Sequence, residues 1–159
     1  MAVWLPQELS ASRPTMPATL ASESKINASH MASSISAIND RLVPKDENDR
    51  SMPYYHWWPK QGTTEWISYE LPQPSTVQSS TVYWFDDAPW GGCRVPKSWK
   101  IYYRDSQGQW QPVTGADNYG TVKGAANTVN FDPVKTSAVK LEVTQPAEYS
   151  SGLFEWEVK

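Results

Sequence analysis

Short runs that alternate between apolar and polar side chains constrain the fold of this chain more than any other feature. Large apolar or aromatic residues occupy every second position of the runs 67–71, 99–103, 139–143 and 154–158. Most runs are bounded by Pro, Gly, Asn or Asp, and no stretch keeps a helical period over three turns. Because successive side chains of a strand point to opposite faces, this pattern predicts antiparallel strands. The sequence therefore predicts an all-β, antiparallel jelly-roll β-sandwich.

Length, charge and cysteine content exclude several other classes of protein. A chain of 159 residues suits one domain, which at this size folds without needing disulfides. The single cysteine, Cys93, excludes an internal disulfide, and we interpret it as a small packed residue. A net charge of −3 and the lack of a basic run argue against a nucleic-acid partner. No apolar run reaches the roughly 18 residues that a transmembrane helix needs.

Residues 1–22 are predicted to be a linker or N-terminal extension, and residues 23–159 to be the folded module. The segment 10–24 is rich in Ser, Ala, Thr and Pro and contains few large apolar residues. Pro14 and Pro17 prevent a continuous helix and favour a semi-extended chain, which suits a tether to an upstream domain. The opening residues lack the basic flank and apolar run of a signal peptide, so any export signal is expected elsewhere.

Five segments resemble, in their order and spacing, the discoidin or coagulation factor 5/8 type C fold of family 32 carbohydrate-binding modules. They are Asn27–His30, Ala37–Asp40, Glu65–Leu71, Pro96–Tyr103 and Gly152–Val158. The resemblance extends from about residue 22 to residue 159. It implies a galactose-binding-domain-like jelly roll with its ligand site on loops at one end. Such modules usually hold an attached glycosidase near its polysaccharide.

An aromatic loop supplies the first group of candidate sugar-binding residues. The chain has nine Trp and eight Tyr but three Phe, which favours rings that carry a polar edge. Sugar rings stack their C–H faces on such rings, and their hydroxyls bond to Asp, Asn, His and Arg. We therefore select Tyr55, His56, Trp57 and Trp58 as candidates. The alternative is that Trp57 and Trp58 cap one end of the sandwich.

A glycine-containing loop and the segment before the last strand supply the remaining candidates. Gly91 and Gly92 allow a sharp turn or a close approach to a ligand, and charged and aromatic residues surround them. Arg94 could fork across two sugar hydroxyls, or it could pair with a neighbouring aspartate and brace the loop. The candidates in these two segments are Trp84, Asp86, Asp87, Trp90, Arg94 and Tyr149.

The resemblance also implies a structural calcium. The family often holds this ion with the aspartate of an Asp-Gly loop and a carboxylate of the final strand, which match Asp40 and Glu155 here. Arg41 stands where the family usually has Gly. Asp49 is added as a third candidate ligand, because hard oxygen ligands suit calcium.

Three functions are compatible with these residues. The first is a non-catalytic carbohydrate-binding module that targets an attached glycoside hydrolase to its glycan. The second is a cell-surface adhesion domain that binds protein or lipid through the same loops. The third is a glycosidase that uses Asp86 and Asp87 as its paired carboxylates. The mixture of rings with Asp, His and Arg favours the first. The protein is expected to be a monomer that is secreted, periplasmic or exposed at the cell surface.

Overall fold

The computed structural model describes residues 16–159 and confirms the all-β expectation. Seven strands and one short 3-10 helix make up the regular structure of this part of the chain. The elements are β1 (Lys25–Ala28), η1 (Ser33–Asn39), β2 (Tyr55–His56), β3 (Thr64–Phe85), β4 (Ser98–Arg104), β5 (Trp110–Pro112), β6 (Asn127–Thr144) and β7 (Gly152–Val158).

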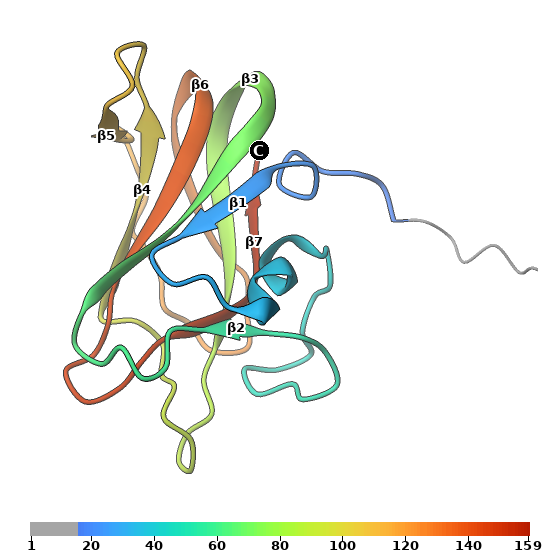
Figure 1. The fold of residues 1–159 in the computed structure, drawn as a ribbon, viewed down its shortest axis with the longest axis vertical. Helices are drawn as coiled ribbons and strands as arrows, with labels where there is room; N and C mark the ends of the chain where they lie inside the picture. The colour runs from blue at the N-terminus through green and yellow to red at the C-terminus, as the bar shows by residue number, and fades with distance from the viewer. Residues whose placement is uncertain (1–15) are drawn as a thin grey trace, which may run out of the picture.

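The long strands β3 and β6 connect the two layers of the sandwich (Figure 1). All pairings between these strands are antiparallel, in the order β2-β7-β3-β6-β4-β5, and β1 pairs with β3. The first part of β3 pairs with β1, whereas its last part pairs with β7. Register shifts between Glu70 and Ser75 and between Val77 and Ser79 separate the two parts. Irregularities of this kind bend a strand, so one strand contributes to both layers.

Aromatic rings from the two layers meet in the core. Tyr69 stacks on Trp156 with ring centroids 4.2 Å apart, and its hydroxyl donates to the Trp156 carbonyl oxygen at 2.8 Å. Trp84 packs edge-on against Trp99 at 5.5 Å. All four rings are buried. Much of the high Trp and Tyr content therefore serves the sandwich interior.

The packed chain begins slightly before the predicted module boundary at residue 23. Ala21 is fully buried in the core, and Thr19 and Ser22 form a turn through reciprocal backbone–side-chain hydrogen bonds. Residues 1–15 of the predicted linker lie outside the described residues. No helix within residues 16–159 is long and apolar enough to cross a membrane.

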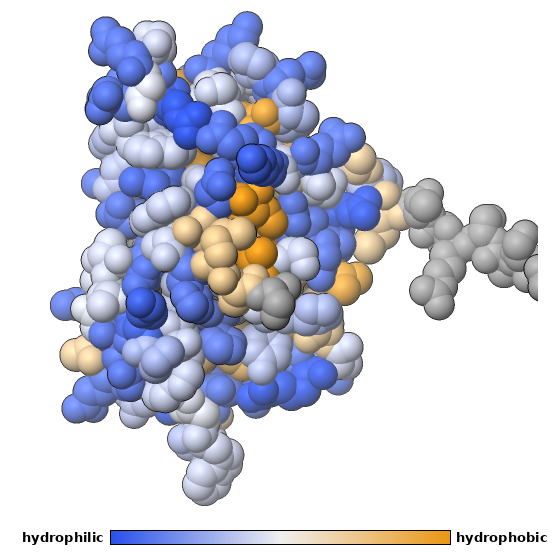
Figure 2. Space-filling model, viewed as in Figure 1, coloured by the Kyte–Doolittle hydropathy of each residue, from blue (hydrophilic) through white to orange (hydrophobic). Residues whose placement is uncertain are grey.

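Several long connections gather at the end of the sandwich where β2 lies. One of them, between β3 and β4, projects beyond the rest of the molecule (Figure 1). The surface in this view is largely hydrophilic, with a small apolar patch near its centre (Figure 2). The connections at this end include the segments 57–63 and 86–97, which carry several of the predicted sugar-binding residues.

Candidate functional site

The two-residue strand β2 decides which rings of the aromatic loop face outward. Tyr55 pairs with Leu153 and His56 with Gly152 of β7. Side chains therefore alternate along this segment, with Tyr55 directed into the core and His56 toward the loops. The outward residues join the connection after β3 around a cavity of about 160 Å³, named here the loop-end cavity. It is lined by Tyr54, His56, Trp58, Phe85, Asp87, Gly92 and Cys93.

Stacked rings form one wall of the loop-end cavity. Tyr54 and Phe85 lie nearly parallel with centroids 4.0 Å apart. Arg50 donates to the Tyr54 hydroxyl at 2.7 Å, and its guanidinium lies 5.2 Å from the centre of the Phe85 ring. This wall is fixed by contacts within the protein, so its shape does not depend on a ligand.

His56 presents one ring nitrogen as a hydrogen-bond donor. Its Nδ1 accepts the Trp58 backbone N–H at 3.2 Å, which places the imidazole proton on Nε2. Burial, opposed by the nearby Asp87 carboxylate, lowers the pKa of His56 below its usual 6.5. The imidazole is therefore neutral at pH 7, and Nε2–H is free to donate to a neutral hydroxyl.

Asp87 and Arg94 brace the loop beside the cavity. Asp87 Oδ1 accepts the Cys93 backbone N–H at 2.8 Å and lies 3.5 Å from the Arg94 guanidinium. Arg94 also donates to the carbonyl oxygens of Gly91 and Cys93 at 2.8 Å each, and it covers the Tyr149 ring at 4.2 Å. The contacts of Arg94 therefore agree with the alternative in which it pairs with an aspartate and braces the loop. Neither Arg94 nor Tyr149 lines the loop-end cavity.

Three predicted sugar-binding rings belong to the core, which corrects the prediction for Tyr55, Trp57 and Trp84. Tyr55 and Trp57 are fully buried, and the Tyr55 hydroxyl donates to the His30 carbonyl oxygen. Trp84 is also buried, and its indole N–H donates to the Gly120 carbonyl oxygen. Because their ring faces contact other core residues, these rings have no free face for a sugar.

Asp86 is also corrected, from a ligand-binding to a structural residue. Its buried carboxylate accepts backbone N–H groups from Ala88 at 3.0 Å and Val95 at 3.1 Å. Lys123 Nζ lies 3.1 Å from the same carboxylate. Asp86 thus ties the two ends of the projecting loop together, whereas the adjacent Asp87 faces the cavity.

The two exposed tryptophans lie at different places in the loops. Trp58 is 43% exposed and lines the loop-end cavity, with Gly92 against its ring. Trp90 is 94% exposed and does not line the cavity. Trp90 therefore offers a free ring on the projecting loop, and only Trp58 offers one inside the cavity.

Sequence reasoning missed Tyr54, Phe85 and Cys93 as cavity residues, whereas it noted that Gly92 allows a close approach to a ligand. Tyr54 and His56 share a parity along the chain, so strict alternation through β2 would have grouped them and excluded Tyr55. Phe85 of the stacked wall and Cys93 are both buried lining residues. Burial raises the pKa of the Cys93 thiol to about 12, which fits the expected packed, unreactive cysteine.

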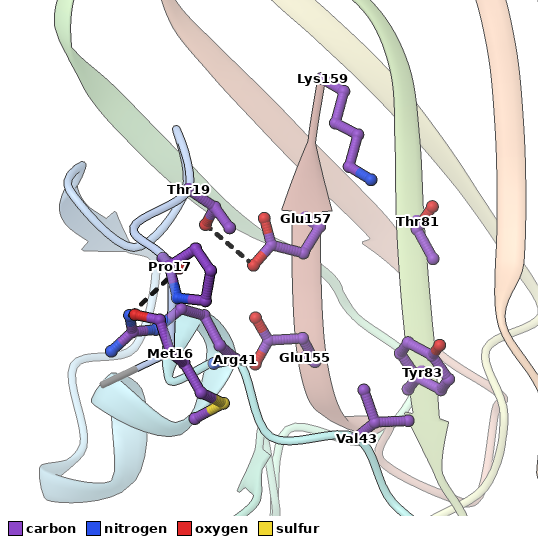
Figure 3. Close-up of a pocket in the computed structure, with 10 residues that line it drawn as sticks. All are labelled: Met16, Pro17, Thr19, Arg41, Val43, Thr81, Tyr83, Glu155, Glu157 and Lys159. Atoms are coloured by element: carbon purple, nitrogen blue, oxygen red, sulfur yellow. Dashed lines mark hydrogen bonds between the residues drawn. The ribbon is translucent and has the colours of Figure 1, made fainter. Parts of the chain in front are cut away.

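A second cavity, of about 390 Å³, contains buried carboxyl groups and is named here the acidic cavity. Glu155 and Glu157 of β7 face Arg41 and the segment 16–19 across it (Figure 3). Glu155 Oε2 accepts the Arg41 backbone N–H at 3.1 Å, while Oε1 has no partner among the described residues. Burial, then Glu157 and Asp40, raise the pKa of Glu155 to about 10.

Arg41 adopts a backbone conformation that is unusual for a residue with a side chain. Its φ of 70° lies in the left-handed region, where glycine is favoured. The guanidinium of Arg41 donates to the carbonyl oxygens of Met16 and Pro17 and so points away from the carboxyl groups toward the N-terminal segment. Arg41 therefore preserves the turn and leaves the unpartnered oxygen of Glu155 free.

Asp49 is corrected as a metal-ligand candidate. Its carboxylate accepts the Ser51 hydroxyl and backbone N–H and the Lys45 backbone N–H, which lower its pKa to about 2. No three His, Cys, Asp or Glu residues within residues 16–159 are grouped closely enough to hold a metal. Asp49 therefore does not join Asp40 and Glu155.

Comparison with known proteins places these features in a family. The family model described as the F5/8 type C domain matches residues 21–157. A chain of the Streptococcus pneumoniae β-galactosidase BgaA superposes with a TM-score of 0.70 at 19% identity, over 84% of this chain and 89% of that one.

Two further solved structures are carbohydrate-binding modules. The family 32 module of Clostridium perfringens NanJ, in complex with galactose, gives a TM-score of 0.66 at 17% identity, over 87% of this chain and 95% of that one. Chitosan-binding module 1 of a Paenibacillus sp. IK-5 chitosanase/glucanase gives 0.64 at 19% identity, over 90% and 99%. These similarities establish a common fold.

Gly92→Ala tests the close contact that shapes the loop-end cavity. A Cβ at this position would lie 2.3 Å from the Trp58 ring, so the ring must move. Overpacking of this kind should lower the free energy of unfolding by about 1–3 kcal/mol, measured by urea denaturation. The double variant Gly92→Ala/Trp58→Ala removes the clash and should recover most of the loss relative to Trp58→Ala. An equal loss in both backgrounds would show that Trp58 does not fix this wall.

Proposed function

The chain belongs to the F5/8 type C domain family, and from this premise we propose that it is a non-catalytic module that binds carbohydrate. The proposal places the ligand in the loop-end cavity. The observation that carries it is the grouping of a partly exposed Trp58 ring with the His56 Nε2–H donor in one small hollow. A flat apolar surface beside a directional donor is the combination that a sugar ring requires.

The size of the loop-end cavity supports weak binding of one sugar unit. Its volume of about 160 Å³ lies below the roughly 300–1,000 Å³ of cavities that enclose drug-sized ligands. One stacked ring and a few hydroxyl contacts compete with water, so we expect dissociation constants of about 10 μM to 1 mM. The C. perfringens NanJ module was solved with galactose, which makes galactose the first sugar to test.

The contacts of the two loop aspartates support a non-catalytic role over the glycosidase alternative. Asp86 is buried and accepts two backbone N–H groups, so its carboxylate is committed to the loop. Asp87 accepts the Cys93 N–H and lies near the guanidinium groups of Arg50 and Arg94. A glycosidase needs two carboxyl groups directed at the scissile bond, whereas these two carboxylates are engaged by backbone N–H groups of their own loop.

The wider context belongs to the proposal as well. We propose that the module acts as a monomer in a secreted, periplasmic or cell-surface protein, joined to a glycoside hydrolase. The support is the similarity to modules found in such enzymes, including the S. pneumoniae β-galactosidase and the Paenibacillus chitosanase/glucanase. Tethering raises the local concentration of enzyme at its glycan even when the module binds weakly.

Trp90 favours one second candidate, adhesion to a lipid surface. Its ring is 94% exposed on a projecting loop, where a large apolar side chain gains little from the folded protein. Co-sedimentation with lipid vesicles that disappears in Trp90→Ala, together with no glycan binding, would support adhesion over carbohydrate recognition.

Substitution of the cavity residues tests the carbohydrate proposal directly. Trp58→Ala and His56→Ala should each weaken binding of the best galactose-containing glycan by at least about tenfold, because each removes one principal contact. Isothermal titration calorimetry after a glycan-array screen provides the measurement.

Two controls make this result specific. Val122→Ala changes an exposed apolar side chain remote from the cavity residues and should leave affinity unchanged. Trp57→Ala removes a core ring and should lower stability without removing the binding surface. Full binding by folded Trp58→Ala and His56→Ala would place the site elsewhere.

The pH dependence of binding tests the role of the neutral imidazole. Protonation of His56 adds a proton at Nδ1 and abolishes its acceptance of the Trp58 N–H. Because the pKa lies below 6.5, affinity should be constant above that pH and fall by up to about tenfold per pH unit below the pKa. His56→Asn should flatten this profile. Affinity that rises on acidification would contradict the assignment.

We further propose that Asp40 and Glu155 hold one calcium ion with loop carbonyl oxygens. The unpartnered Glu155 Oε1 near the Asp40 carboxyl group supports this proposal, because a hard cation prefers oxygen ligands and loop carbonyl oxygens would supply the others. The Arg41 guanidinium is engaged with Met16 and Pro17 and does not occupy this position. When bound, the ion would stabilise the turn at residue 41 and take no part in sugar chemistry.

Calcium titration followed by thermal unfolding tests this proposal. At calcium about tenfold above its dissociation constant, the midpoint should rise by about 4 °C, and chelation should reverse the shift. Glu155→Gln should abolish the response. Asp117→Asn changes an exposed carboxylate elsewhere and should retain it. A midpoint that chelator and calcium both leave unchanged would contradict calcium binding.

A further inference from the structure

The outer face of the β1, β3, β6, β4 and β5 layer contains a groove that shares no lining residue with the loop-end cavity. The strands follow one another across the view of Figure 1. The groove has a volume of about 540 Å³ and is named here the sheet groove. Its lining includes Asn27, Trp66, Glu70, Arg104, Trp110 and Lys140.

Strand register places these side chains on one face. Ser68 of β3 pairs with Asn27 of β1 on one side and with Lys140 of β6 on the other. Lys140 in turn pairs with Tyr102 of β4. Directly paired residues point to the same face of a sheet, so these four side chains form one row that crosses the layer from β1 to β4. With neighbouring strands about 4.8 Å apart, a groove that also reaches β5 is wide enough for more than one sugar ring.

Contacts between the charged and aromatic side chains hold the groove in shape. Arg104 donates two hydrogen bonds to the Glu70 carboxylate, at 2.6 and 2.9 Å, and its guanidinium lies 4.9 Å from the Trp110 ring centre. Lys140 Nζ lies 4.7 Å from the Tyr102 ring centre and 5.2 Å from that of Trp110. Lys140 Nζ also lies 3.4 Å from the Glu142 carboxylate. Both groove cations are therefore fixed by a carboxylate and by aromatic rings before any ligand arrives, which lowers the entropy cost of binding.

The charge of this face has the opposite sign to that of the whole chain. The paired positions on the face carry four cations, Lys25, Lys100, Arg104 and Lys140, and two carboxylates, Glu70 and Glu142. Because Arg104 is ion-paired with Glu70 and Lys140 with Glu142, the positive excess comes from Lys25 and Lys100 beside the groove. The chain as a whole has a net charge of −3. A face with excess positive charge on an acidic protein favours an anionic partner.

We propose that the sheet groove is a second glycan site, which takes an internal stretch of a polysaccharide bearing carboxylate or sulfate groups. The half-buried Trp66 ring provides a stacking surface, and the half-buried Asn27 side chain provides hydrogen bonds to hydroxyls. The two carboxylates on the face disfavour nucleic acid, whose charges are spaced about 1.7 Å apart. A polysaccharide that carries at most one negative charge on each sugar unit matches a face with both cations and carboxylates better than nucleic acid does.

Titration of the full chain with charged and neutral polysaccharides tests the proposal. Polygalacturonate carries only carboxylates and dextran sulfate only sulfates, so the two separate carboxylate from sulfate recognition. Fully methyl-esterified polygalacturonate is the neutral match of the first. At least one charged chain should bind at least tenfold more tightly than the esterified one, and its affinity should fall with added salt. Equal affinity for the charged and esterified chains would overturn the proposal, as would equal binding of polyglutamate.

Matched variants locate the contact. Trp66→Ala and Lys140→Met should each weaken binding by at least tenfold, and Lys140→Met keeps an apolar stem between Tyr102 and Trp110. Lys135→Gln removes one exposed charge outside the groove and should have no effect. Full affinity in Lys140→Met, with the fold verified by circular dichroism, would overturn the site even if Trp66→Ala fails to fold.

Trp58→Ala separates this site from the loop-end cavity. Charged-polysaccharide binding that survives Trp58→Ala and is lost in Lys140→Met supports the sheet groove, whether or not galactose binds at the loop end. Charged-polysaccharide binding that Trp58→Ala abolishes would assign the ligand to the loop-end cavity and overturn a second site.

Discussion

Close contact between β2 and β7 at Gly152 is the constraint on which the loop end depends. A Cβ at Gly152 would lie 2.8 Å from the Tyr55 carbonyl oxygen and 3.0 Å from the Phe85 ring. Any side chain there would push β2 away from β7, because the first neighbour is backbone and the second is a buried ring of the cavity wall. This pairing and the Tyr55 hydroxyl bond to the His30 carbonyl oxygen direct Tyr55 inward, and His56 then points outward. Gly152 thus permits the β2–β7 pairing, and this pairing determines which rings lie in the core and which line the cavity.

Two adjacent carboxylates, Asp86 and Asp87, have different roles in the projecting loop. Asp86 fastens both ends of the loop through the backbone N–H groups of Ala88 and Val95, and Asp87 holds Cys93 opposite it. These bonds fix the backbone that carries Gly92, the residue against which Trp58 rests. The buried Asp86 and the partly buried Asp87 make a rigid frame through these hydrogen bonds, so a ligand does not need to order the loop.

The fold was predictable because long alternating runs leave few alternatives. The runs 67–71, 139–143 and 154–158 all lie in strands, with the expected faces buried. The length of the strands was harder to predict. β3 extends unbroken from Thr64 to Phe85, but the sequence shows it only as separate alternating runs, because the strand bends between them. A bend shifts the register, and periodicity is lost where the register shifts.

The site was less predictable than the fold because its elements are short. A two-residue strand is too brief to be recognised as a strand from sequence, so the alternation that separates Tyr55 and Trp57 from His56 and Trp58 could be applied only once the structure had shown β2. Trp84 lies in a run with rings on both faces, which hides its burial. Asp86 and Asp87 have the same chemistry and differ only in what the folded loop places beside them. In each case tertiary contacts decide the role.

Each contact of such a module with its glycan is expected to be weak, and this limits the affinity that one site can reach. The loop-end cavity is small, and stacking on the single Trp58 ring does not by itself give tight binding. Affinity therefore has to come from linkage, because a second linked contact experiences an effective concentration near the millimolar range. For a contact with a dissociation constant of about 100 μM, that concentration strengthens overall binding about tenfold. Rigid loops and a pre-shaped sheet face favour this arrangement, since each contact then forms with little loss of conformational entropy.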